Sequence, residues 1–159
     1  MACVYLGVGS NINREHYIQL ALDILAQAFG ALTVSSVYRS QAIGFEGDDF
    51  YNLVVLIETD QSVAELFKFL RDVEFCHGRP IDATKSSGRT IDLDILSYDD
   101  WVGDFEGVQL PRAEILYNAF VLRPLAEIAP QVKHPVDGRT YSELWQNFDK
   151  QTQRLSRVS

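Results

Sequence analysis

The residues that could do chemistry are concentrated in one short apolar segment, in which two aspartates stand two positions apart. Asp92 and Asp94 belong to the run Ile-Asp-Leu-Asp-Ile-Leu. In a β-strand, residues at this spacing point to the same face and lie about 6.5 Å apart along the strand. Carboxylates this close repel each other unless a cation lies between them, and such hard oxygen ligands suit Mg²⁺. The segment therefore predicts a magnesium site, although a solvent-facing edge strand with protective charges would give the same pattern.

The loop before this strand supplies positive charge that an anionic ligand needs. Residues 77–89 include His77, Arg79, Lys85 and Arg89 but only a single acid. Arginine offers paired planar donors for phosphate, and loops on a rigid scaffold often carry binding groups. The loop is predicted to clamp a phosphate beside the aspartates, with an ordinary solvated loop as the alternative.

Three further residues could hold a flat polar ligand. Asn52 stands near the start of an otherwise apolar run over 50–59. A buried amide needs hydrogen-bond partners, which can be backbone groups or the edge of a heterocycle. Phe50 and Phe120 could stack on such a ring. The simpler alternatives are a cap or turn role for the asparagine and core packing for the aromatic residues.

The elements that must position these residues follow from hydrophobic periodicity and from helix-capping residues. The expected order is βαββαβ, which favours two split βαβ units that share one antiparallel sheet, with both helices on one face. Gly30 is expected to end the first helix and Ser62 to begin the second. The expected strands cover 2–9, 31–40, 50–59 and 90–97, and the expected helices cover 14–29 and 62–76.

The residues after the fourth strand are expected to form smaller elements that extend this core. No repeat or linker divides the chain, so a single domain over 1–159 is predicted. The expected extension consists of an acidic loop with Asp99, Asp100, Asp104 and Glu106, short helices near 113–117 and 119–128, a turn at Asp137-Gly138 and a helix over 140–147.

Composition and charge restrict the class of function. The chain has 159 residues, of which 47% are hydrophobic and 23% charged, as is typical of a globular protein. Its net charge of -8 disfavours binding to nucleic acid or to a membrane surface. We find no apolar run that could span a membrane and no signal peptide, and we expect Cys3 and Cys76 to be reduced in a cytoplasmic protein.

A set of short motifs along essentially the whole chain is similar to that of a known family. The motifs are Gly9-Ser10-Asn11, Ser35-Ser36-Val37-Tyr38-Arg39-Ser40, Phe50-Tyr51-Asn52, Glu74 with Gly78-Arg79, Arg89 to Leu96, Leu110-Pro111, and Phe120 to Pro130. In this order they resemble the 6-hydroxymethyl-7,8-dihydropterin pyrophosphokinases of folate biosynthesis. The aspartate strand and the last motif are the most specific.

The resemblance implies a ferredoxin-like α+β core and transfer of pyrophosphate from ATP to the pterin hydroxymethyl group, with release of AMP. It also implies two Mg²⁺ ions, held by Asp92 and Asp94, that bridge the ATP phosphates. The expected partners are therefore these small molecules, and we expect a monomer. By position in the motifs, the catalytic residues would be Arg79, Arg89, Asp92 and Asp94.

The resemblance also assigns the two substrates to separate sets of residues. The expected ATP-binding residues are Glu74, Arg79, Lys85, Arg89 and Arg112. The expected pterin-binding residues are Ser40, Ile43, Phe50, Asn52 and Phe120. Among the latter, the two phenylalanines would sandwich the ring, the asparagine would read its amide edge, and the isoleucine would act largely through its backbone.

The chain differs from typical family members at positions that, by the resemblance, surround the ATP phosphates. Typical members carry His at the position of Arg112 and Arg at the position of Asn118. They also carry further arginines and a Trp in the stretch that corresponds to 81–87, where only Lys85 is basic here. These departures predict a modified lid. They leave open a divergent paralogue that binds a pterin or nucleotide without efficient transfer, and a related enzyme with another acceptor.

Overall fold

The computed structural model describes residues 1–40, 49–78, 90–151, 153 and 155–158 of the chain. The predicted residues Ile43, Arg79, Lys85 and Arg89 lie outside the described residues. The strands are β1 (Ala2–Ser10), β2 (Thr33–Val34), β3 (Tyr38–Ser40), β4 (Phe50–Thr59), β5 (Asp92–Tyr98), β6 (Gly103–Phe105), β7 (Val108–Leu110) and β8 (Leu155–Arg157). The helices are α1 (Arg14–Phe29), α2 (Val63–Cys76), α3 (Ala119–Ile128) and α4 (Tyr141–Gln146), with a 3-10 turn, η1, over Ala113–Leu116.

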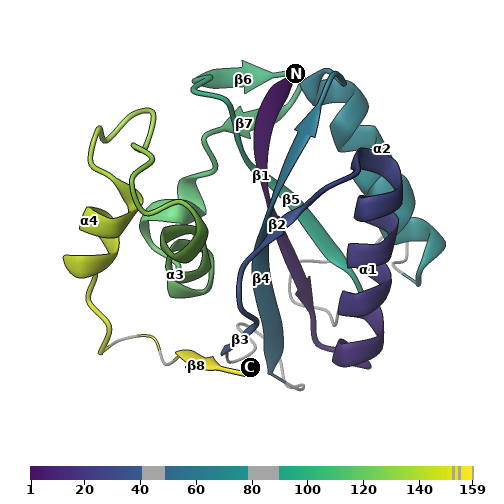
Figure 1. Cartoon of the computed structure of the whole chain (residues 1–159), viewed down its shortest axis with the longest axis horizontal. Helices are drawn as coiled ribbons and strands as arrows, with labels where there is room; N and C mark the ends of the chain where they lie inside the picture. Colours follow the sequence, from purple (N-terminus) through teal and green to yellow (C-terminus); the bar gives the residue numbers. More distant parts are fainter. Residues whose placement is uncertain (41–48, 79–89, 152, 154, 159) are drawn as a thin grey trace.

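One antiparallel sheet organises these elements, with strand order β5–β1–β4–β3–β8 and with β2 also paired to β4. The two strands of each split βαβ unit are separated by a strand of the other unit. This order and the two helices on one face confirm the expected α+β fold with a ferredoxin-like core (Figure 1). The aspartate-bearing β5 lies at the edge of the sheet and the asparagine-bearing β4 lies inside it.

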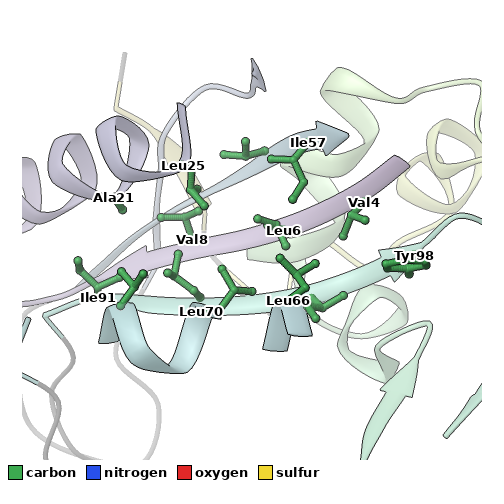
Figure 2. Packing of buried hydrophobic residues seen from close by; sticks show 14 of the residues in the cluster. Val4, Leu6, Val8, Ala21, Leu25, Ile57, Leu66, Leu70, Ile91 and Tyr98 are labelled. Atoms are coloured by element: carbon green, nitrogen blue, oxygen red, sulfur yellow. The ribbon is translucent and has the colours of Figure 1, made fainter. Parts of the chain in front are cut away.

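The main hydrophobic core lies between the sheet and the helices α1 and α2. Alternate residues of β1, namely Val4, Leu6 and Val8, point to this side and are buried. Apolar side chains of both helices cover them at helical spacing (Figure 2). Burial of this face is the main favourable contribution to folding. The helix residues in this core include Ile18, Ala21, Leu25, Val63, Leu66, Leu70 and Val73.

A second, smaller core lies on the opposite face of the sheet, beneath α3 and α4. Val54 of β4 and Leu96 of β5 contribute to it from the sheet, and Leu122, Leu125 and Tyr141 contribute from the helices. These residues are almost completely buried. Figure 1 shows α3 next to the sheet and α4 beside α3, and apolar side chains of both helices belong to this core.

Most of the expected helix boundaries are confirmed, with their physical causes. Gly30 ends α1 with a positive φ of 82°, which glycine adopts without strain. Ser62 begins α2 through a capping box with Glu65, in which each side chain bonds the backbone of the other residue. The helix expected over 119–128 is α3, and the one expected near 113–117 is the short η1.

Three expectations about strands need correction. The strand expected over 31–40 is two short strands, because Ser35 turns its hydroxyl to the backbone N–H of Val54 between them. The acidic loop contains the hairpin β6–β7, which turns at Glu106 and Gly107, both with positive φ. The strand β8 was not expected, because a run of only three residues carries no periodicity.

Two other expectations from the sequence concern the cysteines and membrane segments. Cys3 and Cys76 are both free thiols at exposed positions. Among the residues that the structure describes, we find no helix with the length and apolar character that crossing a bilayer requires.

The carboxylate of Glu127 fixes the C-terminal end of α3 against the sheet. It accepts hydrogen bonds from the backbone N–H of Ser36 at 3.0 Å, from the Ser36 hydroxyl at 2.9 Å and from the Tyr38 hydroxyl at 2.6 Å. These donors come from β3 and the residues before it. The helix is therefore held at a defined place on the sheet by a charged acceptor as well as by apolar packing.

We expect Glu127→Gln to destabilise the protein, because the amide offers one acceptor oxygen and turns an N–H₂ group towards hydroxyl or amide donors. The free energy of unfolding should fall by about 1–3 kcal/mol, which is typical for a half-buried group left without its partner. Denaturant unfolding measures this change. The exposed Glu58→Gln on β4 is the matched control, and an equal effect of both variants would contradict the prediction.

Candidate functional site

A row of polar groups crosses the sheet from its edge strand to its centre. In the strand register, Asp92 of β5 pairs with Gly9 of β1, and Gly9 pairs with Asn52 of β4. Asn52 in turn pairs with Tyr38 of β3. Because directly paired residues point to the same face of a sheet, the aspartate and the asparagine lie on one face, with a glycine between them.

The neighbouring row shows which face this is. Asp94 pairs with Gly7, and Gly7 pairs with Val54, which belongs to the core beneath α3 and α4. Asp92 and Asp94 therefore face the side of α3, as their spacing predicted, while Leu93 between them is buried on the side of α2. The two aspartates thus share one face of the strand, as the sequence indicated, and this face lies on the side of α3.

The glycine at the centre of the polar row leaves bare backbone between the two groups. A Cβ atom at Gly9 would lie 2.8 Å from Oδ1 of Asn52 and 3.8 Å from Cδ1 of Phe50. No real Cβ atom fits at the shorter distance, so a side chain here would displace the asparagine. Glycine in the middle of a strand often marks a place where a ligand approaches the backbone closely.

The amide of Asn52 is held by a hydroxyl from the neighbouring strand. Its Nδ2 donates to Oγ of Ser40 at 2.8 Å, and Ser40 is buried in the register position opposite Phe50. The amide oxygen is turned towards Gly9. Ser40, Phe50 and Asn52 therefore lie together on the same face of the sheet as the aspartates, with an aromatic ring beside an oriented amide.

Asp94 occupies an environment that disfavours its charge. Its side chain is only 21% exposed, and an Arg112 Nη1 lies 3.7 Å from its Oδ1. Burial first, and then the charge of Asp92, raise the pKa of Asp94 to about 7, although the guanidinium of Arg112 acts in the opposite direction. β5 is an edge strand, but this aspartate is not a solvent-facing protective charge, which disfavours the alternative interpretation of the motif.

Arg112 is itself held by a carboxylate that the sequence did not single out. Its Nε and Nη2 lie 2.8 Å and 2.6 Å from Oε1 of Glu114. The other oxygen of Glu114 accepts a hydrogen bond from Nδ2 of Asn118 at 3.0 Å. Glu114 thus orders Arg112 and Asn118, two of the positions at which the sequence differs from the motifs that it resembles.

Asp92 and Asp94 form a donor set that fits a hard divalent cation in part. In the described portion of the chain, no group of three or more His, Cys, Asp or Glu side chains could hold a metal ion. Mg²⁺ does not need such a group, because it binds through one or two carboxylates, substrate phosphates and water. A cation between the aspartates would also relieve their repulsion.

Glu74 fixes the strand between the two aspartates from the opposite side. It is fully buried, its Oε2 accepts a hydrogen bond from the backbone N–H of Leu93 at 2.8 Å, and its Oε1 pairs with Arg71. These contacts hold the edge strand β5 against α2. A contact of Glu74 with ATP, which the resemblance implies, remains a prediction.

Phe120 lies in the first turn of α3 and packs, half-buried, against the core beneath that helix. It therefore belongs to the same side of the sheet as Asn52 and the aspartates. The structure brings together Ser40, Phe50, Asn52, Asp92 and Asp94 through the strand register and adds Arg112 through Asp94.

Comparison with known proteins assigns the chain to a family. Residues 5–130 match the model of the family described as 7,8-dihydro-6-hydroxymethylpterin-pyrophosphokinase, or HPPK. The chain belongs to the HPPK family. The match covers β1 through α3 and so includes both the aspartate strand and the asparagine strand.

Two relatives are similar in sequence to this chain over most of its length. It is 38% identical over 138 residues to a 2-amino-4-hydroxy-6-hydroxymethyldihydropteridine pyrophosphokinase of Aquifex aeolicus, covering 86% of each chain. It is 35% identical over 150 residues to the folic acid synthesis protein fol1 of Schizosaccharomyces pombe, covering 92% of this chain but only 20% of that protein.

The fold is also that of a solved HPPK structure. The chain superposes on the crystal structure of Plasmodium falciparum HPPK-DHPS wild type with SDX-DHP with a TM-score of 0.73 and 14% sequence identity. The match covers 92% of this chain and 43% of the other, so the chain spans less than half of that structure. At this identity the likeness concerns the fold.

Two features of the candidate site were missed by reasoning from residue types. Gly9 was noted only as part of a motif, although a glycine inside an apolar strand is itself a signal of close approach. No sequence pattern indicated Glu114, because it can orient Arg112 beside Asp94 only when the chain after β7 runs back to β5. The backbone N–H of Arg112 donates to the carbonyl of Leu96 at 2.8 Å and so fixes that return.

We expect Asp94→Asn to stabilise the metal-free protein in a pH-dependent way. The pKa of Asp94 is about 7 in the folded state and about 4 in the unfolded state, so the folded state binds the proton more tightly. The free energy of unfolding of the wild type therefore falls as the pH rises from about 4 through about 7. The variant removes this loss, and its melting temperature should exceed that of the wild type at pH 8 but not at pH 4.

Melting curves from pH 4 to pH 8 in a chelator measure this difference. Its size at pH 8 should be on the order of 1–3 kcal/mol, because part of the charge penalty is screened. The exposed Asp60→Asn is the control and should follow the wild type at every pH. Parallel curves for Asp94→Asn and the wild type would contradict the raised pKa.

Proposed function

We propose that this chain transfers pyrophosphate from ATP to the hydroxymethyl group of 6-hydroxymethyl-7,8-dihydropterin and releases AMP, as a step of folate biosynthesis. The observation that carries the proposal is the polar row in which Asp92 and Asn52 face the same side of the sheet across the bare backbone of Gly9. A carboxylate that would hold Mg²⁺ for the ATP phosphates and an amide that would bind a heterocycle are then neighbours. Membership of the HPPK family supports the same activity.

The pterin end of the proposed site is the part around β3 and β4. A flat ring rich in amide groups needs a slot with aromatic faces and polar edges. Phe50 and Phe120 would supply the faces, and Asn52, oriented by Ser40, would read the amide edge. Ile43, which completes this set by resemblance, lies outside the described residues.

The ATP end of the proposed site is the part around β5. Asp92 and Asp94 would hold Mg²⁺, with two ions by resemblance, which when bound neutralises phosphate charge and aligns the substrates for in-line displacement. Arg112, beside Asp94, would direct its guanidinium to the phosphates. The proposal adds Glu74, Arg79 and Arg89 to this ATP-binding set by position in the family motifs, with Arg79 and Arg89 also catalytic. It adds Lys85 as the basic residue of the stretch 81–87.

The bond changes follow from the products. The hydroxymethyl oxygen of the pterin bonds to the β-phosphorus of ATP, and the bond from that phosphorus to the α–β bridging oxygen breaks. AMP leaves with this oxygen, and the hydroxyl proton passes to solvent. The protein's contribution is to hold the two reactants in line and to offset the charge on the phosphates.

The proposal includes the remaining expectations from the sequence. It takes residues 1–159 as one domain that acts as a monomer in the cytoplasm on small-molecule substrates, without a nucleic-acid or membrane partner. The net charge of -8 supports the last point, because the protein's field repels phosphate-rich surfaces.

The decisive experiment is an AMP-release assay on the purified chain with ATP, Mg²⁺ and 6-hydroxymethyl-7,8-dihydropterin, with products identified by mass. We expect AMP and the pterin pyrophosphate in equal amounts. Asp92→Ala should lower the rate by at least about 100-fold, as is typical when a group that stabilises transition-state charge is removed. Pterin binding without turnover would favour the divergent paralogue, and turnover only with another heterocyclic alcohol would indicate a different acceptor.

The variant Gly9→Ala tests whether pterin binding needs the uncovered backbone between the ATP end and the pterin end of the proposed site. Because its Cβ atom would lie 2.8 Å from Oδ1 of Asn52, the amide must move, and we expect pterin affinity to fall about tenfold or more. Calorimetry or pterin fluorescence measures the affinity. Gly7→Ala is the matched control on the same face, because its Cβ atom would meet Leu96 at an ordinary 3.4 Å. Equal losses in both variants would contradict this role of Gly9.

A further inference from the structure

The side chain of Gln153 bridges two backbone groups at the start of α3. Its Oε1 accepts a hydrogen bond from the N–H of Ala119 at 2.7 Å, and its Nε2 donates to the carbonyl of Tyr117 at 2.7 Å. The side-chain amide of Gln153 therefore makes hydrogen bonds with the backbone of these two residues as a neighbouring strand would. Ala119 is the first residue of α3, and the first N–H groups of a helix have no partner within the helix.

This distant side chain acts where a local cap is missing. The N-cap residue Asn118 makes no side-chain hydrogen bond to the helix backbone. Its Nδ2 is instead directed to Oε2 of Glu114 at 3.0 Å. Asparagine is one of the preferred N-cap residues, but here its side chain is used elsewhere, and Gln153 satisfies the first N–H group of the helix from 34 residues away.

The residues just after Gln153 extend the sheet beside the pterin end of the site. In β8, Leu155 pairs with Ser40 and Arg157 pairs with Tyr38. The N–H of Val158 continues this ladder by donating to the carbonyl of Val37 at 2.8 Å. Figure 1 shows β8 alongside β3 at the end of the sheet where β4 begins. The strand that carries Ser40 is therefore paired on both sides, by β4 and by β8.

The same short stretch of chain therefore contacts both walls of the proposed pterin slot. One wall is the first turn of α3 with Phe120, which directly follows Ala119. The other wall is β3 and β4, where Ser40 holds the amide of Asn52. Gln153 is joined to the first wall by side-chain hydrogen bonds, and β8 is joined to the second by backbone pairing.

We propose that Gln153 is a positioning residue that sets Phe120 at its working distance from the Ser40–Asn52 edge and so determines affinity for the pterin. It acts through Ala119 and Tyr117 and does not touch the substrate. The inference rests on the proposed function, because it assigns the pterin to the space between these walls. In that proposal ATP binds around β5, which Gln153 reaches only indirectly, through the backbone beside Asn118 and the hydrogen bond of Asn118 to Glu114. The affinity for ATP should therefore change less than the affinity for the pterin.

The test is the steady-state kinetics of Gln153→Ala. We expect KM for the pterin to rise about five- to tenfold, the loss typical of a missing cap, because a smaller fraction of the protein then has Phe120 in place. KM for ATP and kcat should stay within about twofold, since the aspartates are unaffected. A residue that only stabilised the fold would raise both KM values together or lower the yield of active protein.

Two variants and one independent measurement make the test specific. Gln151→Ala, an exposed glutamine nearby, is the matched control and should behave as the wild type. Gln153→Glu keeps an acceptor for the Ala119 N–H but cannot donate to the Tyr117 carbonyl, so it should restore part of the pterin affinity. Hydrogen exchange of the Ala119 amide, measured without ligand, should accelerate in Gln153→Ala but not in Gln151→Ala.

The outcomes separate this inference from the proposed function. Faster exchange at Ala119 with an unchanged KM for the pterin would overturn the inference and leave the proposed function intact. An unchanged exchange rate would overturn it as well, because the bridge would then not hold the helix. A wild-type chain that neither binds nor converts the pterin would overturn both, and the exchange rates alone would then report on the bridge.

Discussion

Two negative charges held on one face of a half-buried edge strand are the constraint on which the rest of the site depends. Asp92 and Asp94 repel each other, and burial makes this repulsion more costly, as the raised pKa of Asp94 shows. The strand keeps its place because Glu74 binds its backbone and Arg112 approaches from beside it. A cation bound between the two carboxylates would offset this cost, and a local loss of stability of this kind is common at functional sites.

One face of the sheet carries the main core, and the opposite face carries the residues of the proposed site. One face is covered by α1 and α2 and carries the main apolar core. On the opposite face, α3 packs over an apolar area that includes Val54 and Leu96. Gly7, which lies beside them, and Gly9 separate the aspartates from β4 without side chains of their own. The proposed binding surface is thus the part of the sheet where these two glycines leave the backbone without side chains that cover it.

The helix α3 forms one wall of the site and is fixed at both of its ends by groups from other elements. At its C-terminal end, Glu127 accepts hydrogen bonds from Ser36 and Tyr38. At its N-terminal end, Gln153 binds the backbone of Ala119 and Tyr117. Both ties lead to β3 and the chain around it, so the helix and the strands that orient the Asn52 amide are held as one unit.

The sequence by itself determined what depends on near neighbours. Alternation along the strand placed Asp92 and Asp94 on one face, and the capping signal at Ser62 located a helix end, because both effects act within a few residues. Only the tertiary structure decided that Gly9 lies between the aspartates and the amide and that Gln153 reaches α3. These are contacts between segments distant along the chain, and they follow from strand register and from the path of the backbone. No local preference of a residue contains that information.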